Sequence, residues 1–74
     1  MIRTYVIEAA DRQQVLNYFG SLHDAKRFIE SGFRKSDSLI KDSHVLAIRG
    51  DYFGEGFHKY ILKFSGEKWK RFKI

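Results

Sequence analysis

Basic and aromatic side chains alternate along the last eighteen residues of the chain, in a pattern that could bind nucleic acid. Residues 57–74 contain six Lys/Arg residues and one acidic residue, whereas residues 1–56 contain eight of each kind. The whole formal charge of +5 therefore belongs to this C-terminal segment. Cations in such a segment neutralise phosphates and release counterions, and an aromatic ring among them can stack on a base.

The faces on which these side chains lie depend on the loop that joins two predicted strands, 57–64 and 69–74. A three-residue loop at 65–67 pairs Phe64 with Lys68 and Tyr60 with Phe72, and it is preferred because it keeps buried charge low. In this register the candidate binding residues lie on one face together with Ile61; they are Lys59, Lys63, Trp69, Arg71 and Lys73. A two-residue loop at Gly66 and Glu67 pairs Phe64 with Trp69 instead and mixes the two kinds of side chain.

The same hairpin fits two other interpretations. Lysines on solvent-facing strands protect a sheet from edge-to-edge aggregation, and Trp69 would then belong to the core. Alternatively, the lysines meet an acidic protein surface. Salt dependence tests the nucleic-acid role: about five phosphate contacts give a slope of log affinity against log salt near −4.5, and a flat salt response would exclude it.

A glycine-rich loop between Gly50 and Gly56 contains two further aromatic residues, Tyr52 and Phe53. It lacks the Lys-Ser/Thr pair of a phosphate-binding loop, and a strand rather than a helix is expected to follow it. A hairpin connection explains its glycines better. Tyr52 and Phe53 are candidate anchors for a protein partner if they are exposed, although they could equally pack back onto the sheet.

No pattern in the chain predicts catalysis, a metal site or a cofactor site. There is no cysteine, and the three histidines, His23, His44 and His58, have no short ligand spacing. A site shared by His44 and His58 across neighbouring strands is the remaining metal hypothesis, and it is not favoured. The carboxylates are scattered singly through turns and loops, and no nucleophile motif is present. We therefore expect a non-enzymatic binding protein without a cofactor.

The elements that must position these residues read as strand, strand, helix, strand, strand, strand. Strands are expected at 2–9 and 14–19, separated by a turn at 10–12, and again at 44–49. A helix is expected to begin after Ser21, with Asp24 in a capping box, and to end at Gly32 in the left-handed conformation. Its apolar stripe consists of Leu22, Ala25, Phe28 and Ile29. Residues 34–43 are expected to form a surface loop.

This order predicts an α+β fold in one domain, residues 1–74: a four- to five-stranded, mainly antiparallel sheet with one helix packed on one face (ββαβββ). Twelve aromatic residues in so short a chain also suggest a core that borrows from a second copy, as in a homodimer. No apolar run approaches the roughly 20 residues that span a bilayer. Arg3 and Glu8 interrupt the N-terminal apolar run, so no signal peptide is expected.

The strand pair that leads into the segment 21–30, in a very short chain without a linker, resembles small phage- or mobile-element-encoded accessory proteins. These include anti-defence and anti-CRISPR inhibitors. The resemblance implies a lone sheet-and-helix domain that blocks or redirects host machinery, in the cytoplasm of the host if the chain is phage-encoded. Inhibitors that mimic DNA are strongly acidic, so the basic charge argues against mimicry and favours binding to nucleic acid or a nucleoprotein.

Overall fold

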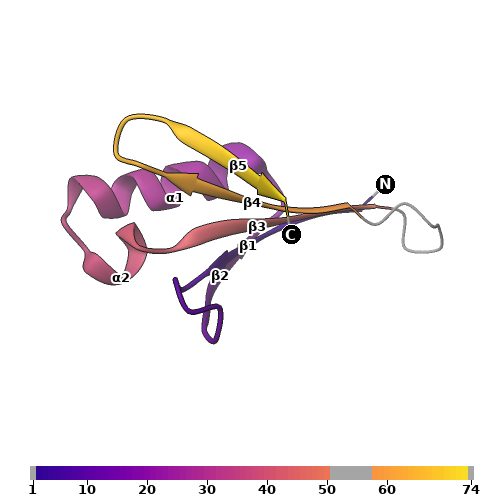
Figure 1. Ribbon diagram of the computed structural model, residues 1–74, viewed down its shortest axis with the longest axis horizontal. Coiled ribbons are helices and arrows are strands. Elements are labelled where there is room, and N and C mark those ends of the chain that lie inside the picture. Colours follow the sequence, from indigo (N-terminus) through magenta and orange to yellow (C-terminus); the bar gives the residue numbers. More distant parts are fainter. Residues whose placement is uncertain (1, 51–57, 74) are drawn as a thin grey trace.

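A computed structural model describes residues 2–50 and 58–73 (Figure 1). The elements are β1 (Ile2–Glu8), β2 (Val15–Phe19), α1 (Leu22–Arg34), α2 (Ser38–Lys41), β3 (His44–Gly50), β4 (His58–Phe64) and β5 (Trp69–Lys73). The strands form one antiparallel sheet in the order β2-β1-β3-β4-β5, with β2 and β5 at its edges. The predicted α+β class and the order ββαβββ are confirmed, with α2 as a short addition.

Helix α1 packs on one face of the sheet, which we call the helix side. The buried cluster joins Ala25 and Ile29 of α1 to residues from three central strands: Tyr5, Ile7, Val45, Ala47 and Leu62. In β1 and β3 the cluster takes every second residue, as the pleat requires. The intervening residues point to the other side, which we call the open face. In the orientation of Figure 1, α1 passes behind β4 and β5.

Helix α1 begins where predicted, but the predicted capping box of Ser21 and Asp24 is not formed, and the helix ends later than predicted. Ser21 is the N-cap residue, although its side chain makes no capping hydrogen bond. The helix continues through Gly32 to Arg34, and Lys35 ends it in the right-handed conformation. The predicted stop at Gly32 is therefore wrong. After Gly32, Phe33 meets Phe64 of β4 edge to face, with 4.9 Å between the ring centroids.

The predicted loop 34–43 contains a helix of one turn, α2. The carboxylate Oδ1 of Asp37 accepts hydrogen bonds from the backbone N–H groups of Leu39 (3.1 Å) and Ile40 (3.3 Å). Ile40 packs close to Gly32, whereas Leu39 is 50% exposed and does not enter the core. The sequence signal for this element is Asp37, a residue type that commonly caps the start of a helix.

The two N-caps give a matched pair of predictions. Asp37→Ala is expected to lower the free energy of unfolding by about 1 kcal/mol, because two N–H groups lose their acceptor. Ser21→Ala is expected to stay within about 0.5 kcal/mol of the wild type, because Ser21 makes no capping bond to lose. Urea unfolding of both variants measures the difference, and equal losses would contradict the assignment of the caps.

Candidate nucleic-acid interface

The turn between β4 and β5 has a different register from the preferred prediction. The backbone N–H of Ser65 donates to the carbonyl of Lys68 (3.0 Å), and the Ser65 hydroxyl accepts from the N–H of Lys68 (3.3 Å). Gly66 takes a left-handed φ of 98° between them. The result is a two-residue loop that pairs Phe64 with Trp69 and Tyr60 with Lys73. The prediction of a three-residue loop was wrong because it did not consider the hydrogen bonds between Ser65 and Lys68, which close the shorter turn.

This register divides the candidate residues between the two faces of the sheet. Lys59 and Lys63 lie on the open face, whereas Trp69, Arg71 and Lys73 lie on the helix side, opposite Phe64, Leu62 and Tyr60. The prediction that all five share one face is therefore wrong. Arg71 and Lys73 are not buried by this arrangement. They stay exposed because β5 is an edge strand of the sheet.

Trp69 is held within the hairpin rather than offered to a base. Its ring stacks on Phe64, with centroids 5.0 Å apart and an interplanar angle of 28°. The ammonium of Lys26, from α1, lies 5.5 Å from the centre of the same ring. Trp69 is half-buried and packs against the core cluster. It therefore joins β5 to α1, which matches the alternative interpretation that it belongs to the core.

A different set of side chains forms a continuous row across the open face. The strand registers place in one line, from edge to edge, Tyr18, Val6, Leu46, Ile61 and Phe72. The members on the inner strands are largely covered, with Val6 7% and Ile61 2% exposed. The two aromatic rings at the ends are open, with Tyr18 63% and Phe72 45% exposed. Four strand spacings separate them, or about 19 Å.

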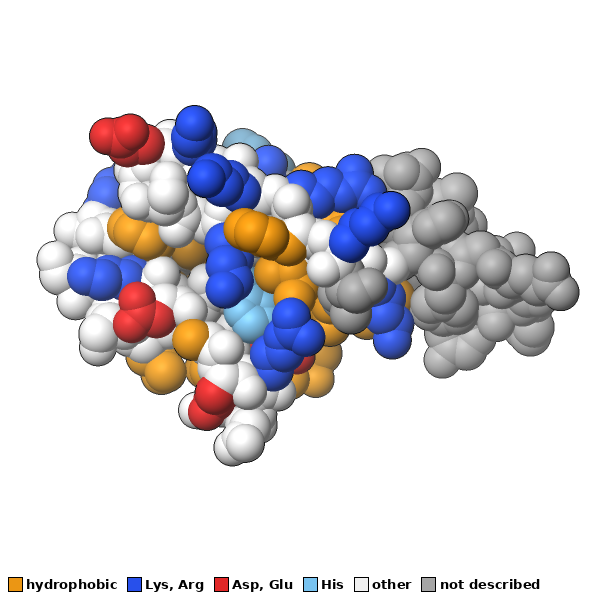
Figure 2. All heavy atoms as spheres, in the orientation of Figure 1, with side chains coloured by type: hydrophobic (Ala, Val, Ile, Leu, Met, Phe, Trp, Pro, Cys, Tyr) orange, Lys and Arg blue, Asp and Glu red, His pale blue; other side chains and the backbone are white. Residues whose placement is uncertain are grey.

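Three lysines stand beside this row at its β4–β5 end. Lys63 and Lys70 pair directly across the two strands, and Lys59 lies on the other side of Ile61. The ammonium of Lys63 is 6.0 Å from the centre of the Phe72 ring. Among the residues that the structure describes, no carboxylate lies within 4.0 Å of these ammonium groups. Figure 2 shows basic and hydrophobic side chains next to one another over these strands.

A direct pair of lysines is unfavourable unless an anion neutralises it. Like charges opposite each other on neighbouring strands destabilise a sheet. The carboxylate of Glu8 contacts Nε2 of His44 (2.9 Å), and no ion pair joins it to these lysines in the described part of the chain. The open face thus combines two exposed rings with a local excess of positive charge. Sequence reasoning missed Tyr18, Lys70 and Phe72 as site residues, because only the combined registers bring them into one surface.

His44 does not present a ligand to this surface. It is 1% exposed, its Nε2 is engaged by Glu8, and its Nδ1 is buried without a hydrogen-bond partner in the described part of the chain. His23 lies exposed on α1. Residues 2–50 and 58–73 contain no group of three side chains that could hold a metal ion.

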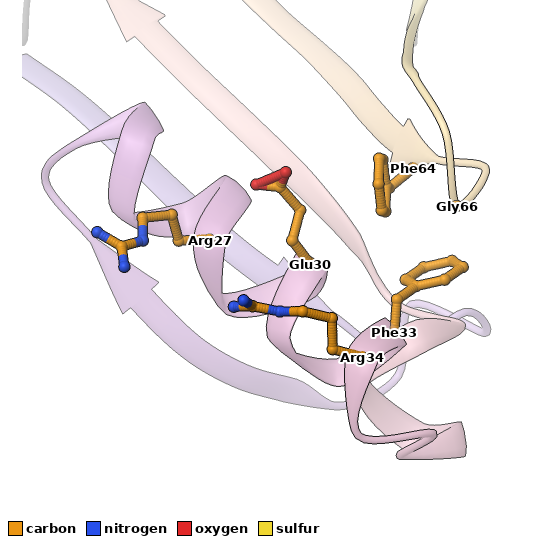
Figure 3. A pocket seen from close by; sticks show the side chains of 6 residues that line it. All are labelled: Arg27, Glu30, Phe33, Arg34, Phe64 and Gly66. Atoms are coloured by element: carbon orange, nitrogen blue, oxygen red, sulfur yellow. The ribbon is translucent and has the colours of Figure 1, made fainter.

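An open cleft of about 560 Å³ lies between α1 and the β4–β5 turn (Figure 3). It is lined by Arg27, Glu30, Phe33, Arg34, Phe64 and Gly66. Phe33 and Phe64 point toward each other, whereas the guanidinium groups of Arg27 and Arg34 point away from them, along the outside of the helix. The charged and aromatic parts of this cleft therefore do not converge on one bound group.

Tyr52 and Phe53 lie outside the described residues, as does the rest of the glycine-rich loop at 51–57. Their role as anchors for a protein partner stays a prediction. The described helices include none with the length and apolarity to cross a membrane.

Comparisons with known proteins add no relative to this picture. No family model, no curated protein and no solved structure matches the chain. Any proposal about function therefore depends on the geometry of the sheet and its side chains.

Proposed function

We propose that this protein is a non-enzymatic module that binds single-stranded nucleic acid across the open face of its sheet. The observation that carries the proposal is the row that begins at Tyr18 and ends at Phe72, with Lys59, Lys63 and Lys70 beside it. Exposed rings stack on bases of any sequence, and lysines next to them contact the phosphates. The proposed place of action is the cytoplasm, where such strands occur.

A single strand fits this surface better than a duplex. The bases of a duplex are stacked on one another, so two rings about 19 Å apart cannot reach their faces. In a single strand the bases can separate and lie on Tyr18 and Phe72, while the chain between them crosses the apolar middle of the row. Phosphates would then meet the paired ammonium groups of Lys63 and Lys70 and relieve their repulsion.

An acidic protein surface is the competing partner for the open face, and exposure argues against it. A protein partner gains most from apolar side chains that it removes from water. Val6 and Ile61, on either side of Leu46 in the row, are almost fully covered already, and Leu46 is half-buried. The row's most exposed side chains are the two rings, and the lysines beside them are exposed as well, whereas Leu46 is only partly accessible. Rings and lysines are the groups that a nucleic acid uses.

Salt dependence tests the electrostatic part of the proposal. Three phosphate contacts by Lys59, Lys63 and Lys70 predict a slope of log affinity against log salt of about −2 for a single strand. Fluorescence anisotropy with a labelled ten-nucleotide strand, in DNA and RNA versions, measures this slope. Replacing the three lysines with alanine is expected to weaken binding about tenfold at 0.1 M salt and to flatten the slope.

A variant with the same change in net charge provides the control. Alanine at Arg27, Arg34 and Lys35 removes three cations that lie exposed on α1 or at its end. We expect this variant to keep the wild-type slope. A control that loses as much affinity as the open-face variant would show only nonspecific attraction, and a salt-independent affinity of the wild type would rule out phosphate binding.

A further inference from the structure

The free edge of β5 has backbone groups whose direction follows from the hairpin turn. In an antiparallel pair, directly hydrogen-bonded residues alternate with unbonded ones. The bond from Ser65 N–H to Lys68 C=O makes this pair a bonded one. Counting along the register, Lys70 and Phe72 direct their N–H and C=O groups toward β4. The N–H and C=O groups of Trp69, Arg71 and Lys73 therefore point away from β4, on the outer side of the last strand in the described part of the sheet.

We propose that this edge binds an extended acidic peptide as a sixth strand. A strand added to a sheet edge gains affinity from main-chain hydrogen bonds and specificity from its alternate side chains. The proposal goes beyond nucleic-acid binding, because it uses the edge and the helix side of β5 rather than the open face.

The side chains of β5 define which peptide fits. The residues with outward backbone groups are also those whose side chains lie on the helix side, namely Trp69, Arg71 and Lys73. A neighbouring strand would place every second side chain beside Trp69, Arg71 and Lys73, so acidic residues are favoured at the alternate positions that face the two cations. The guanidinium of Arg71 lies 4.2 Å from the centre of the Tyr60 ring, which holds it in place on this side of the sheet.

The same charges disfavour two other arrangements. A second copy of the chain that paired β5 with β5 would bring the lysines and arginines of both strands together, and such pairs repel. The opposite edge, β2, consists of Val15, Leu16, Asn17, Tyr18 and Phe19, with no charged residue. An acidic strand is therefore directed to β5 rather than to β2.

Amide hydrogen exchange tests this proposal directly. The probe is a labelled seven-residue peptide that alternates glutamate with valine or threonine, and a peptide of the same composition with its glutamates in one block is the control. In the free protein we expect slow exchange at Lys70 and Phe72 and fast exchange at Trp69, Arg71 and Lys73. The alternating peptide is expected to slow exchange at the latter three at least tenfold.

Two substitutions of Arg71 distinguish the contribution of its backbone N–H to peptide binding from the contribution of its charge. Arg71→Ala removes the cation and its contact with the Tyr60 ring but keeps the backbone N–H, and it is expected to weaken peptide binding about threefold. Arg71→Pro also removes an outward N–H, which a strand edge tolerates, and is expected to weaken it more than tenfold. Equal losses would overturn the proposal, and retained slow exchange at Phe72 shows that the proline variant keeps the hairpin.

Three results of the exchange experiment would also overturn the proposal. They are unchanged exchange with the peptide, slowing at the same three amides by an oligonucleotide instead, and concentration-dependent slowing in the protein alone. The second result would assign the edge to phosphates, and the third to a second copy of the chain.

Discussion

Alanine at both Tyr18 and Phe72 is expected to weaken binding of a single-stranded oligonucleotide about thirtyfold. Stacking of one base on an aromatic ring contributes roughly 1–3 kcal/mol, so the loss of two rings costs about 2 kcal/mol at the low end of that range. Each single variant is expected to bind the oligonucleotide about fivefold more weakly, because the rings lie at opposite edges of the sheet and contact different bases. Fluorescence anisotropy at constant salt measures all three affinities.

A matched control comes from the exposed apolar residue on α2. Leu39 is 50% exposed, comparable with Phe72, but it belongs to α2 rather than to the sheet. Leu39→Ala is expected to leave the affinity within twofold of the wild type. A loss as large as that of the Tyr18 or Phe72 variant would show that exposed apolar area in general, and not the row, determines binding.

Leucine at the same two positions distinguishes stacking from apolar contact. Leucine still covers Val6 and Ile61, the neighbours of Tyr18 and Phe72 in the row, so the sheet keeps its packing. It has no ring face for a base, and the oligonucleotide affinity should again fall by more than tenfold. If the leucine variant binds as the wild type does, the open face is an apolar docking surface for protein and the nucleic-acid proposal is wrong.

The sequence was sufficient for the layers of this fold but not for its surfaces. The apolar stripe of α1 and the strands at both ends of the chain predicted a sheet with one covered face, and the structure confirms it. Which side chains share a face of the hairpin depended on whether the loop between β4 and β5 has two residues or three. Because side chains alternate along a strand, the shorter loop at Gly66 and Glu67 moved Trp69, Arg71 and Lys73 to the helix side.

The row across the open face could not be found from any single strand. Tyr18 and Phe72 are 54 positions apart in the chain, and four separate registers bring them into one line. Each register is fixed by turn geometry and by burial of the helix-side residues. The charge of the hairpin was visible in the sequence, but which lysines stand beside an exposed ring was not.

Gly32 is important for a different reason from the one that the sequence suggests, and its substitution is expected to cause the largest change in the free energy of unfolding. The sequence presented it as the left-handed end of a helix, but it lies inside α1 and is buried. A Cβ at this position would lie 2.7 Å from Cβ of Ile40 and 3.3 Å from the backbone nitrogen of Lys41. Glycine is required here because α2 packs directly against the backbone of α1, and the connection returns the chain to β3.

Gly32→Val is therefore expected to lower the free energy of unfolding by about 3 kcal/mol, the upper part of the range for overpacked cores. Gly32→Ala is expected to lower it by about 1 kcal/mol, because the same collision is partly offset by the better helix propensity of alanine. The sign of the alanine effect decides between two explanations. If Gly32 were only a flexible residue in a helix, Gly32→Ala would raise the free energy of unfolding of the protein instead of lowering it. Gly20→Ala is the control, because a Cβ there meets nothing within 4 Å. Urea unfolding of the three variants tests whether the packing of α2 against α1, rather than helix propensity, sets the stability at this position.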